Sequence, residues 1–528
     1  MSTVSKKSPV VPKRPLSERL RAKRATSGSS KSAPKTSSPS DPVLKSKRTK
    51  PPVRKSPSKP TRKPVQKSTV KKFSKKETTD KPLWKHQAKT LKFAKKRQRV
   101  FDASDPGTGK TRAHLESFAL RRRQKGGALL VIAPKSLLQT AWQNDASEYV
   151  SDMSTSVAYA SNREAAFAIK ADIYITNTDA VKWLAKQPDS FYKRFDSVVV
   201  DESTTFKHRT SQRSKALNNI RGYFPFRTMM TGTPNAGSIL NLFNQIFFLD
   251  DGVRLGNNFF KYRSAVCTPE QVGPSVNMLK WTDKDGAEEA VSGLIRDITI
   301  RHQFEDCMDI PPNHTYPVKY HMPNKLMNQY RELEERTILA LQEDDVTAVN
   351  AAVLRNKLLQ LASGAVYTST GVYEILDKGR YELVLDLVEQ RDHSIVFFNW
   401  RHQREQLVAE AERRGVTYEV LDGTTPDDKR TAIVSSYQAG RFQTLFLHPQ
   451  TGAHGLTLTR GTACIFSSPI YEADYLKQGL HRVYRGGQTL PTETILIEAE
   501  NTVEKKVYSI LNGKNERMVN LLEMLKDE

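Results

Sequence analysis

The chain has 528 residues with a formal net charge of +26, and 38% of its residues are apolar and 8% aromatic. This length and apolar content suffice for two or three domains with buried cores, which excludes a wholly disordered chain. Cys267, Cys307 and Cys464 lie far apart without a paired spacing, so the sequence predicts neither a disulfide framework nor a zinc site. No apolar run reaches membrane-spanning length and no secretory signal is recognisable, so we expect an intracellular protein without a membrane partner.

Most of the positive charge lies in residues 1–80. This segment holds 24 lysines and arginines against four acidic residues, a net charge of +20, and Phe73 is its one aromatic residue. Such a composition cannot bury enough apolar surface to offset the entropy of ordering, so it predicts a disordered tail. Nucleic acid is the polyanion that we expect the tail to bind, and a solvated linker or a nuclear localisation signal is the alternative.

The segment 81–250 has the pattern of a parallel α/β domain. Short β-rich runs at 128–134, 171–177, 197–203 and 227–233 are separated by stretches long enough for helices. The segment 376–528 repeats the pattern with runs at 393–400, 417–423, 443–449, 463–469 and 492–499. We therefore expect two α/β domains in tandem.

Helical periodicity dominates the segment between them, residues 251–375. It is clearest at 350–364, where Val353, Leu354, Leu358 and Leu361 recur at helical spacing before Gly364. The sequence thus predicts a helical insertion between the two α/β domains.

The stretch that begins RVFD at residue 99 is expected to run from an apolar strand into a glycine-rich turn and then into a helix. In DPGTGKT (105–111), Gly107 and Gly109 allow the backbone to wrap round a phosphate, Lys110 can reach the β- and γ-phosphates, and the Thr111 hydroxyl can bind Mg²⁺. The usual phosphate-loop pattern begins with glycine, where this chain has Ser104. The predicted loop residues at this site are Asp105, Pro106, Gly107, Thr108, Gly109, Lys110 and Thr111.

An acidic pair, Asp201 and Glu202, ends the apolar run at 197–203. Ligands of open α/β sheets bind at the carboxyl ends of strands, so Asp201 is predicted to position Mg²⁺ and Glu202 to activate the attacking water. Taken alone, such a pair is also typical of a solvated strand end. The phosphate loop 91 residues earlier favours the catalytic interpretation.

These motifs and their order resemble the Swi/Snf-type ATPases of helicase superfamily two, above all the compact versions carried by bacteriophages. In the first half the resemblance rests on LWKHQ (83–87), DPGTGKT (105–111), VIAPKSLLQTAW (131–142), DEST (201–204) and MTGTPNAGSILNLFNQIFFLD (230–250). In the second half it rests on IVFFNW (395–400), HPQTGAHGLTLT (448–459) and QGLHRVYRGGQ (478–488). It covers residues 81–525. It implies two RecA-like parallel-sheet domains, at 81–250 and 376–528, ATP and Mg²⁺ as cofactors, and double-stranded DNA as the partner.

The resemblance also assigns roles to single residues. Gln87 is expected to pair with the adenine edge through its amide. Thr231 and Thr233 are expected either to report loss of the γ-phosphate or to stabilise a turn. Arg482 and Arg485, three residues apart on one predicted helical face, are expected to act as arginine fingers when the domains close.

Several strand ends are expected to contact nucleic acid, because the resemblance places the DNA track there. These positions are Lys135, Asn177, Thr178, Trp400 and Thr451, with Pro134, Ser136, Asn399 and Gly452 beside them. The carboxylate motif of the family, motif II, corresponds here to DEST (201–204). It has Ser203-Thr204 where many relatives have a histidine, so coupling through that histidine is not available here.

The sequence as a whole predicts a monomeric, DNA-dependent ATPase that moves along double-stranded DNA. Two alternatives remain open at this point. One is a strand-separating DNA or RNA helicase of the same superfamily, and the other is a DNA-packaging or architectural protein with a vestigial ATPase.

Overall fold

The computed structural model of the chain describes residues 81–235, 238–271, 279–342, 348–368, 370–452, 456–470 and 473–512. The basic tail, residues 1–80, lies outside the described residues. Its predicted disorder and its DNA binding therefore stay predictions.

The first sheet has seven strands among the described residues, in the order β3-β4-β2-β5-β6-β1-β9, and its pairings are parallel. Its strands are Arg99–Asp102 (β1), Ala128–Ala133 (β2), Thr155–Ala158 (β3), Ile173–Asn177 (β4), Phe195–Val200 (β5), Phe226–Met230 (β6) and Thr299–Ile300 (β9). The four β-rich runs predicted in 81–250 are all present as strands. The short strands β3 and β9 were not anticipated.

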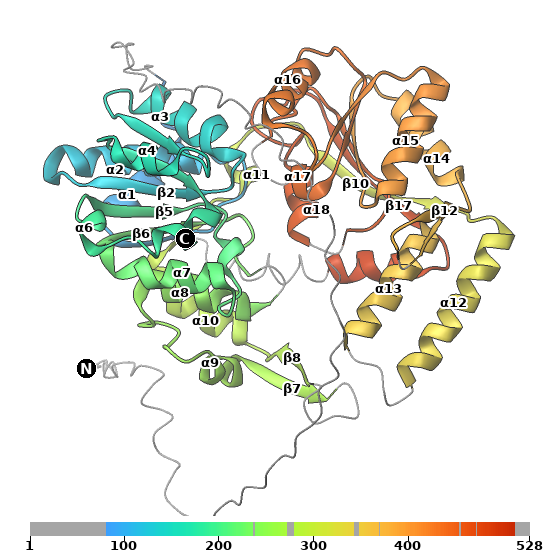
Figure 1. Cartoon of the computed structure of the whole chain (residues 1–528), viewed down its shortest axis with the longest axis horizontal. Helices are drawn as coiled ribbons and strands as arrows, with labels where there is room; N and C mark the ends of the chain where they lie inside the picture. The colour runs from blue at the N-terminus through green and yellow to red at the C-terminus, as the bar shows by residue number, and fades with distance from the viewer. Residues whose placement is uncertain are drawn as a thin grey trace, which may run out of the picture. The chain divides into compact units, whose positions relative to one another are not determined.

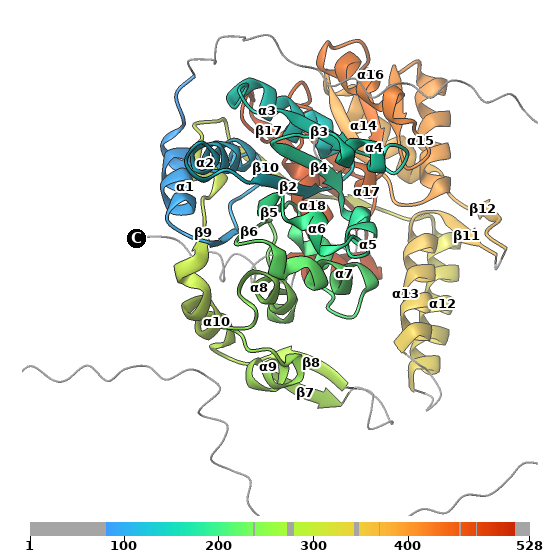
Figure 2. The same cartoon turned by 60° about the vertical axis from the view of Figure 1, so that its left-hand side comes forward.

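Both faces of this sheet are buried, because successive side chains of a strand point to opposite sides. In β2, Leu130 and Ile132 join one apolar core while Leu129 and Val131 join the other. Figures 1 and 2 show α2 and α3 on one side of the sheet and α7 and α8 on the other. The helices are Lys85–Lys95 (α1), Lys110–Lys125 (α2), Asn144–Tyr149 (α3), Arg163–Ala168 (α4), Val181–Leu184 (α5), Asp189–Tyr192 (α6), Gln212–Ile220 (α7) and Leu242–Asp250 (α8).

The second sheet has six strands among the described residues, in the order β10-β17-β16-β13-β15-β14, again in parallel. They are Asn313–Tyr320 (β10), Ser394–Phe397 (β13), Tyr418–Leu421 (β14), Thr444–Leu447 (β15), Ala463–Phe466 (β16) and Thr492–Ala499 (β17). Its helices are Gly379–Glu389 (α14), Arg401–Arg414 (α15), Asp427–Gln438 (α16), Pro449–Gly452 (α17) and Ala473–Leu480 (α18). The predicted tandem of two parallel α/β domains is thus confirmed.

The intervening segment, 251–375, is helical only in part. It contains Phe259–Val266 (α9), Ala287–Ile295 (α10), Phe304–Cys307 (α11), Asn324–Gln342 (α12) and Ala348–Ala362 (α13). Two small antiparallel hairpins also occur there, Cys267–Gln271 (β7) with Leu279–Asp283 (β8) and Ala365–Tyr367 (β11) with Tyr373–Ile375 (β12). Helices α12 and α13 lie side by side in both views (Figures 1 and 2). The same segment supplies the edge strand β9 to the first sheet and β10 to the second, which the helical periodicity did not predict.

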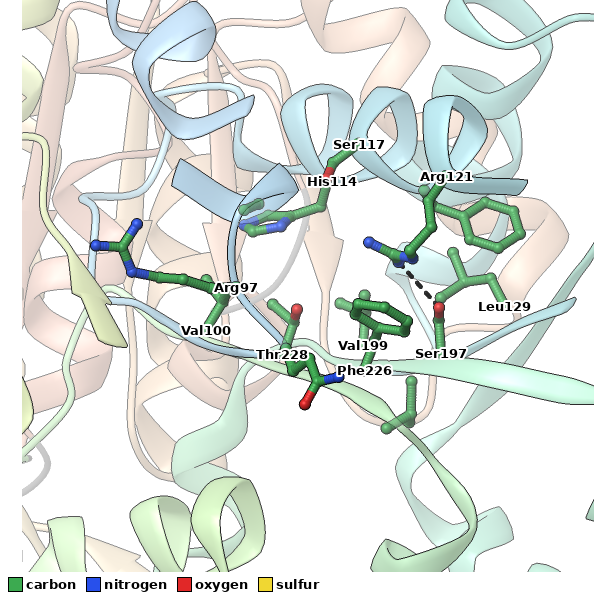
Figure 3. Close-up of a pocket in the computed structure, with 14 residues that line it drawn as sticks. Arg97, Val100, His114, Ser117, Arg121, Leu129, Ser197, Val199, Phe226 and Thr228 are labelled. Atoms are coloured by element: carbon green, nitrogen blue, oxygen red, sulfur yellow. Dashed lines mark hydrogen bonds between the residues drawn. The ribbon is translucent and has the colours of Figure 1, made fainter. Parts of the chain in front are cut away.

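A small polar cavity lies beneath α2 in the first domain (Figure 3). His114, Ser117 and Arg121 of α2 face it, and Arg121 donates a 2.9 Å hydrogen bond to the Ser197 hydroxyl across it (Figure 3). Its volume of about 20 Å³ has room for about one water molecule. This cavity is therefore too small to hold a nucleotide, and the candidate site lies elsewhere.

Candidate active site

The phosphate loop joins β1 to α2 and is tightly wrapped at two glycines. Gly107 has φ +87° and Gly109 has φ +70°, in the left-handed region that other residues rarely adopt. A β-carbon at Gly109 would lie 2.3 Å from the Gln87 amide nitrogen, and one at Gly107 would lie 3.0 Å from the Phe304 ring. Backbone conformation and close approach together require glycine at both positions, as the sequence predicted for a loop that cradles phosphate.

Lys110 begins α2, so Thr111 lies in the first turn of that helix. The Lys110 amine donates hydrogen bonds to two loop carbonyls, those of Ser104 at 2.6 Å and Asp105 at 3.0 Å. The amine is thus held at the loop itself. A bound triphosphate could replace the two carbonyls as the hydrogen-bond partner of this amine.

Ser104 takes the place of the expected glycine because its side chain has a structural partner. Its hydroxyl accepts a 3.1 Å hydrogen bond from the backbone N–H of His302, just after β9. Its own N–H donates to the Asp102 carboxylate at 3.0 Å, and the other oxygen of that carboxylate lies 2.9 Å from His114 Nε2. Burial alone would raise the pKa of Asp102, but the contacts with His114, Lys110 and Ser104 hold it well below its usual range. The base of the loop is therefore fixed by a buried hydrogen-bonded pair, Asp102 and His114.

Gln87 and its neighbour His86 tie α1 to the loop. The Gln87 amide donates to the Gly109 carbonyl at 3.2 Å and its oxygen accepts from the Trp84 N–H at 3.0 Å, while His86 Nε2 lies 2.8 Å from the Thr108 carbonyl. Both polar atoms of the Gln87 amide thus have protein partners, and pairing with adenine would require their exchange. The role of Gln87 toward adenine stays a prediction, and His86 is a loop contact that the sequence analysis missed.

The acidic pair follows β5 directly, as predicted. The buried Asp201 accepts a 2.9 Å hydrogen bond from the indole N–H of Trp142, which lies in the short π-helix Leu138–Gln143 (η1). Burial and the neighbouring Glu202 carboxylate raise the pKa of Asp201, and the Trp142 hydrogen bond and the charge of Lys110 oppose this rise. A buried carboxylate whose pKa is raised, with a second carboxylate beside it, fits a site completed by a divalent cation. Trp142 is a second missed residue, because an aromatic side chain in an apolar helical stretch usually predicts only core packing.

Glu202 has φ +48° and ψ +54°, a left-handed conformation that is strained for a residue with a β-carbon. Its N–H donates to Asp201 Oδ1 at 2.9 Å, which helps to hold the turn. A strained backbone conformation persists only where the surrounding structure imposes it, and such conformations occur mostly at functional sites.

Motif II is connected to the turn after β6 by Gln245 of α8. The buried Ser203 hydroxyl donates to the Gln245 side-chain oxygen at 2.6 Å, and the Gln245 amide donates to the Pro234 carbonyl at 2.8 Å. In the same turn Thr231 Oγ1 accepts from the Thr233 N–H at 3.1 Å, which is the turn-stabilising role left open above. Gly232 packs so closely on the loop residue Pro106 that a β-carbon would lie 2.6 Å from the proline ring. This route joins the acidic pair to the phosphate loop without a histidine.

Arg482 and Arg485 lie beyond the end of α18, which stops at Leu480, so the expectation that both are on one helical face is wrong. The two side chains still converge, because each donates a 3.1 Å hydrogen bond to the Leu456 carbonyl. Burial, followed by the charge of Arg485, lowers the pKa of Arg482 to about 9, and the charge of Glu202 opposes the fall. A β-carbon at Gly107 would lie 3.6 Å from that of Arg485. Both arginines of the second domain thus lie beside the motifs of the first.

The expected nucleic-acid contacts of the first domain lie at the carboxyl ends of neighbouring strands. Strands β2 and β4 are paired with Ala133 opposite Asn177, which places Lys135 and Thr178 at the same sheet edge. Lys135 is exposed, whereas the Asn177 side-chain oxygen accepts a 3.1 Å hydrogen bond from Arg163.

The second domain repeats this arrangement at β13 and β15, which end opposite each other at Phe397 and Leu447. Trp400 follows the first strand and Thr451 follows the second, within α17. Trp400 lines a cavity of about 270 Å³ together with His448 and Tyr475. Asn399 has an internal role, since its amide donates to the Ser468 hydroxyl and the Pro469 carbonyl, both at 2.8 Å.

The ATPases of helicase superfamily two are defined by three features that this chain has. They have two parallel α/β domains in tandem, a phosphate loop with an acidic pair on the first domain, and paired arginines on the second. Comparison with models of protein families agrees with this class and identifies the family within it. The SNF2-related domain matches residues 86–364, and the helicase conserved C-terminal domain matches residues 379–487. The chain therefore belongs to the SNF2-related family, as the resemblance predicted.

Among curated proteins, the chain is 26% identical over 444 residues to the putative protein p41 of Acyrthosiphon pisum secondary endosymbiont phage 1, covering 80% of this chain and 93% of that protein. It is 23% identical to the ISWI chromatin-remodeling complex ATPase CHR11 of Arabidopsis thaliana, covering 77% of this chain. The chain is also 21% identical to the chromodomain-helicase-DNA-binding protein 1-like of Danio rerio, covering 79% of this chain. It spans only 39% of the length of the Arabidopsis remodeller and 41% of the length of the Danio rerio protein.

Among solved structures, the chain is similar to the Sulfolobus solfataricus SWI2/SNF2 ATPase core in complex with dsDNA, with a TM-score of 0.40 and 20% identity over 84% of this chain and 93% of that one. In the part of the chain that the structure describes, none of the helices is both long and apolar enough to cross a membrane.

Proposed function

We propose that this protein is an ATP-dependent motor that couples ATP hydrolysis between its two α/β domains to movement along double-stranded DNA. The observation that carries the proposal is the convergence of two arginines of the second domain on the loop and acidic pair of the first. Arg485 lies against Gly107, and the charge of Arg482 acts on that of Glu202. Hydrolysis that needs groups from both domains is thereby tied to the opening and closing of the cleft.

Each group has one role in this proposal. The wrapped loop and Lys110 bind the phosphates, Thr111 and Asp201 hold Mg²⁺, and Glu202 orients the attacking water and accepts its proton. Mg²⁺, when bound, neutralises charge on the phosphates. Arg482 and Arg485 stabilise the charge that develops as the terminal phosphate bond breaks. Gln87 is proposed to select adenine.

DNA is the proposed track, contacted by Lys135, Asn177, Thr178, Trp400 and Thr451 at the two sheet edges. The printed names of the remodeller relatives, a helicase-DNA-binding protein and a chromatin-remodeling ATPase, support this choice. Since the chain spans only about two fifths of those proteins, their wider activities are not transferred to it.

Phosphate release measured with and without DNA tests the proposal. We expect ATP hydrolysis by the full chain to rise steeply with blunt duplex DNA, and to rise much less with single-stranded DNA or duplex RNA. Glu202→Gln serves as the inactive control, and Glu164→Gln, an exposed change on α4, as the matched active control.

Displacement of a third strand from a DNA triplex then measures movement without strand separation. ATP-dependent release of that strand, with a forked duplex left intact, is the expected result. Unwinding of the fork would instead support a strand-separating helicase, stronger stimulation by RNA would support an RNA-directed enzyme, and absence of hydrolysis with every nucleic acid would support the architectural alternative.

A further inference from the structure

One lysine of the second domain reaches the phosphate loop itself. Lys477 of α18 donates a hydrogen bond from Nζ to Oδ1 of Asp105 at 2.8 Å. The two residues are 372 positions apart in sequence, and their side chains are largely buried, with exposed fractions of 16% and 5%. The sequence analysis gave Asp105 a place in the loop but singled out no partner for it.

Asp105 joins several parts of the site. Its second carboxylate oxygen accepts from Arg301 at 3.0 Å and from the Phe304 N–H at 3.1 Å. Its backbone carbonyl accepts from Lys110 at 3.0 Å. The residue that binds Lys477 through its side chain therefore also binds the phosphate-contacting lysine through its backbone.

Lys477 also lies in the same short segment as the two arginines. Arg482 is held to this segment by its N–H, which donates to the Gly479 carbonyl at 3.0 Å, and by Nε, which donates to the Gln478 carbonyl at 2.8 Å. His481 packs on Phe304, with ring centroids 5.7 Å apart. Fixing Lys477 on Asp105 thus limits where the arginines can lie relative to Gly107 and Glu202.

We propose that Lys477 is a positioning residue for hydrolysis, whose ion pair with Asp105 sets the arginines of the second domain on the phosphate loop when the cleft closes. This inference rests on the proposed function, because it assigns a task within the same reaction. It differs from the arginine-finger role, since Lys477 acts through Asp105 and α18 and touches neither the phosphates nor the water.

The energetics separate this task from simple stabilisation of the fold. Loss of one partner of a buried ion pair is costly when the other charge is left without compensation. Asp105 keeps Arg301 and the Phe304 N–H after removal of Lys477, so the loop retains a charged partner. Removal is therefore expected to weaken domain closure more than the folding of either domain.

The test compares Lys477→Met, which keeps the length of the side chain without its charge, with Lys477→Arg. For Lys477→Met we expect kcat at saturating duplex DNA to fall by about 10²-fold, because small misplacement of catalytic groups has effects of that order, with the KM for ATP nearly unchanged. Lys477→Arg should recover most of the loss. Lys506→Met, an exposed change, is the matched control.

A double variant identifies the route of the effect. If Lys477 acts by placing Arg485, Lys477→Met should cost little further turnover in an Arg485→Ala background. Multiplicative losses in the double variant, or unchanged kcat in Lys477→Met, would overturn the proposal. A loss confined to KM, or one that arginine does not recover, would also overturn it, because it would indicate a role in nucleotide binding or packing.

A readout independent of turnover keeps this inference separate from the proposed function. Fluorescence energy transfer can report the distance between the two domains. The dyes are attached to cysteines introduced at two exposed positions, Gln124→Cys and Glu412→Cys, and Cys307→Ser removes the native cysteine that is not fully buried. Binding of ADP–aluminium fluoride should bring the two domains of the wild-type protein together and so raise the energy transfer, and it should not do so in Lys477→Met. Closure of the wild type without DNA-stimulated hydrolysis would reject the proposed function alone, whereas equal closure of both proteins would reject the role of Lys477.

Discussion

Glu202 brings together a strained backbone and the proposed base of the reaction. Its left-handed conformation aligns it next to the buried Asp201, so its removal should affect chemistry rather than nucleotide affinity. For Glu202→Gln we expect turnover to fall by about 10²- to 10⁴-fold with ATP binding largely kept. Lys110→Ala should instead lose binding and turnover together, because the phosphates lose their charged partner. Fluorescent-nucleotide titration beside phosphate release distinguishes the two, and hydrolysis by Glu202→Gln at the parental rate would contradict its assignment.

Arg482 and Arg485 are expected to act on the transition state and not on the bound substrate. Arg485→Ala should reduce DNA-stimulated turnover by about 10³-fold or more, and Arg482→Ala more moderately, while both variants bind ATP and DNA. Arg413→Ala, an exposed change at the end of α15, is the control. Turnover and both affinities are measured in parallel. Collapse of ATP affinity would show that these arginines act in the ground state.

Single residues also show which parts of the candidate site could be predicted from the sequence and which could not. Gly107, Lys110, Asp201 and Arg485 lie in contiguous motifs whose spacing carries the chemistry, so they could be found from the sequence. The partners that hold them could not, because each comes from far away in the chain: Trp142 lies 59 residues from Asp201 and Lys477 lies 372 from Asp105. Neither residue type nor local spacing predicts such a pairing.

Among the elements, strands with both faces buried were predictable, whereas the edge strands β3, β9 and β10 were not. Runs such as 128–134 are continuously apolar because helices cover both faces of the sheet. Strand β10 is mostly polar and contains Pro317, which a strand tolerates at a sheet edge, and β9 has only two residues. The two edge strands taken from 251–375 therefore escaped a search for apolar runs.

The link between motif II and the turn after β6 gives a prediction for element packing. Gln245→Leu removes the partners of the buried Ser203 hydroxyl and the Pro234 carbonyl, so it should cost about 1–3 kcal/mol in the free energy of unfolding of the first domain. Adding Ser203→Ala should recover part of this loss, because one unpaired polar group is then removed. Urea denaturation followed by tryptophan fluorescence measures both changes. A double variant less stable than Gln245→Leu alone would contradict the hydrogen-bonded route.

For the whole molecule, the basic tail and the two-domain motor are expected to make separable contributions to DNA binding. A shortened chain beginning at Thr79 loses 21 net positive charges, so its DNA affinity should fall and its dependence on salt should flatten. Its maximal ATPase at saturating duplex should stay close to that of the full chain, because the predicted catalytic motifs all follow residue 82. Fluorescence anisotropy at several salt concentrations, beside ATPase titrations, tests this. Equal salt slopes would favour the linker or localisation alternative.

The pairing of β10 with β17 has a consequence for synthesis of the chain on the ribosome. Tyr316 and Glu493, hydrogen-bonded across these two strands, are separated by 177 residues. At translation rates of about 5–20 residues per second, β10 waits for its partner for about 10–35 s, while the first domain already has all of its own strands. During that interval β10 presents an unpaired edge, and its polar residues and Pro317 make it a poor template for aggregation. The same features that made β10 hard to predict from the sequence protect the nascent protein until β17 emerges.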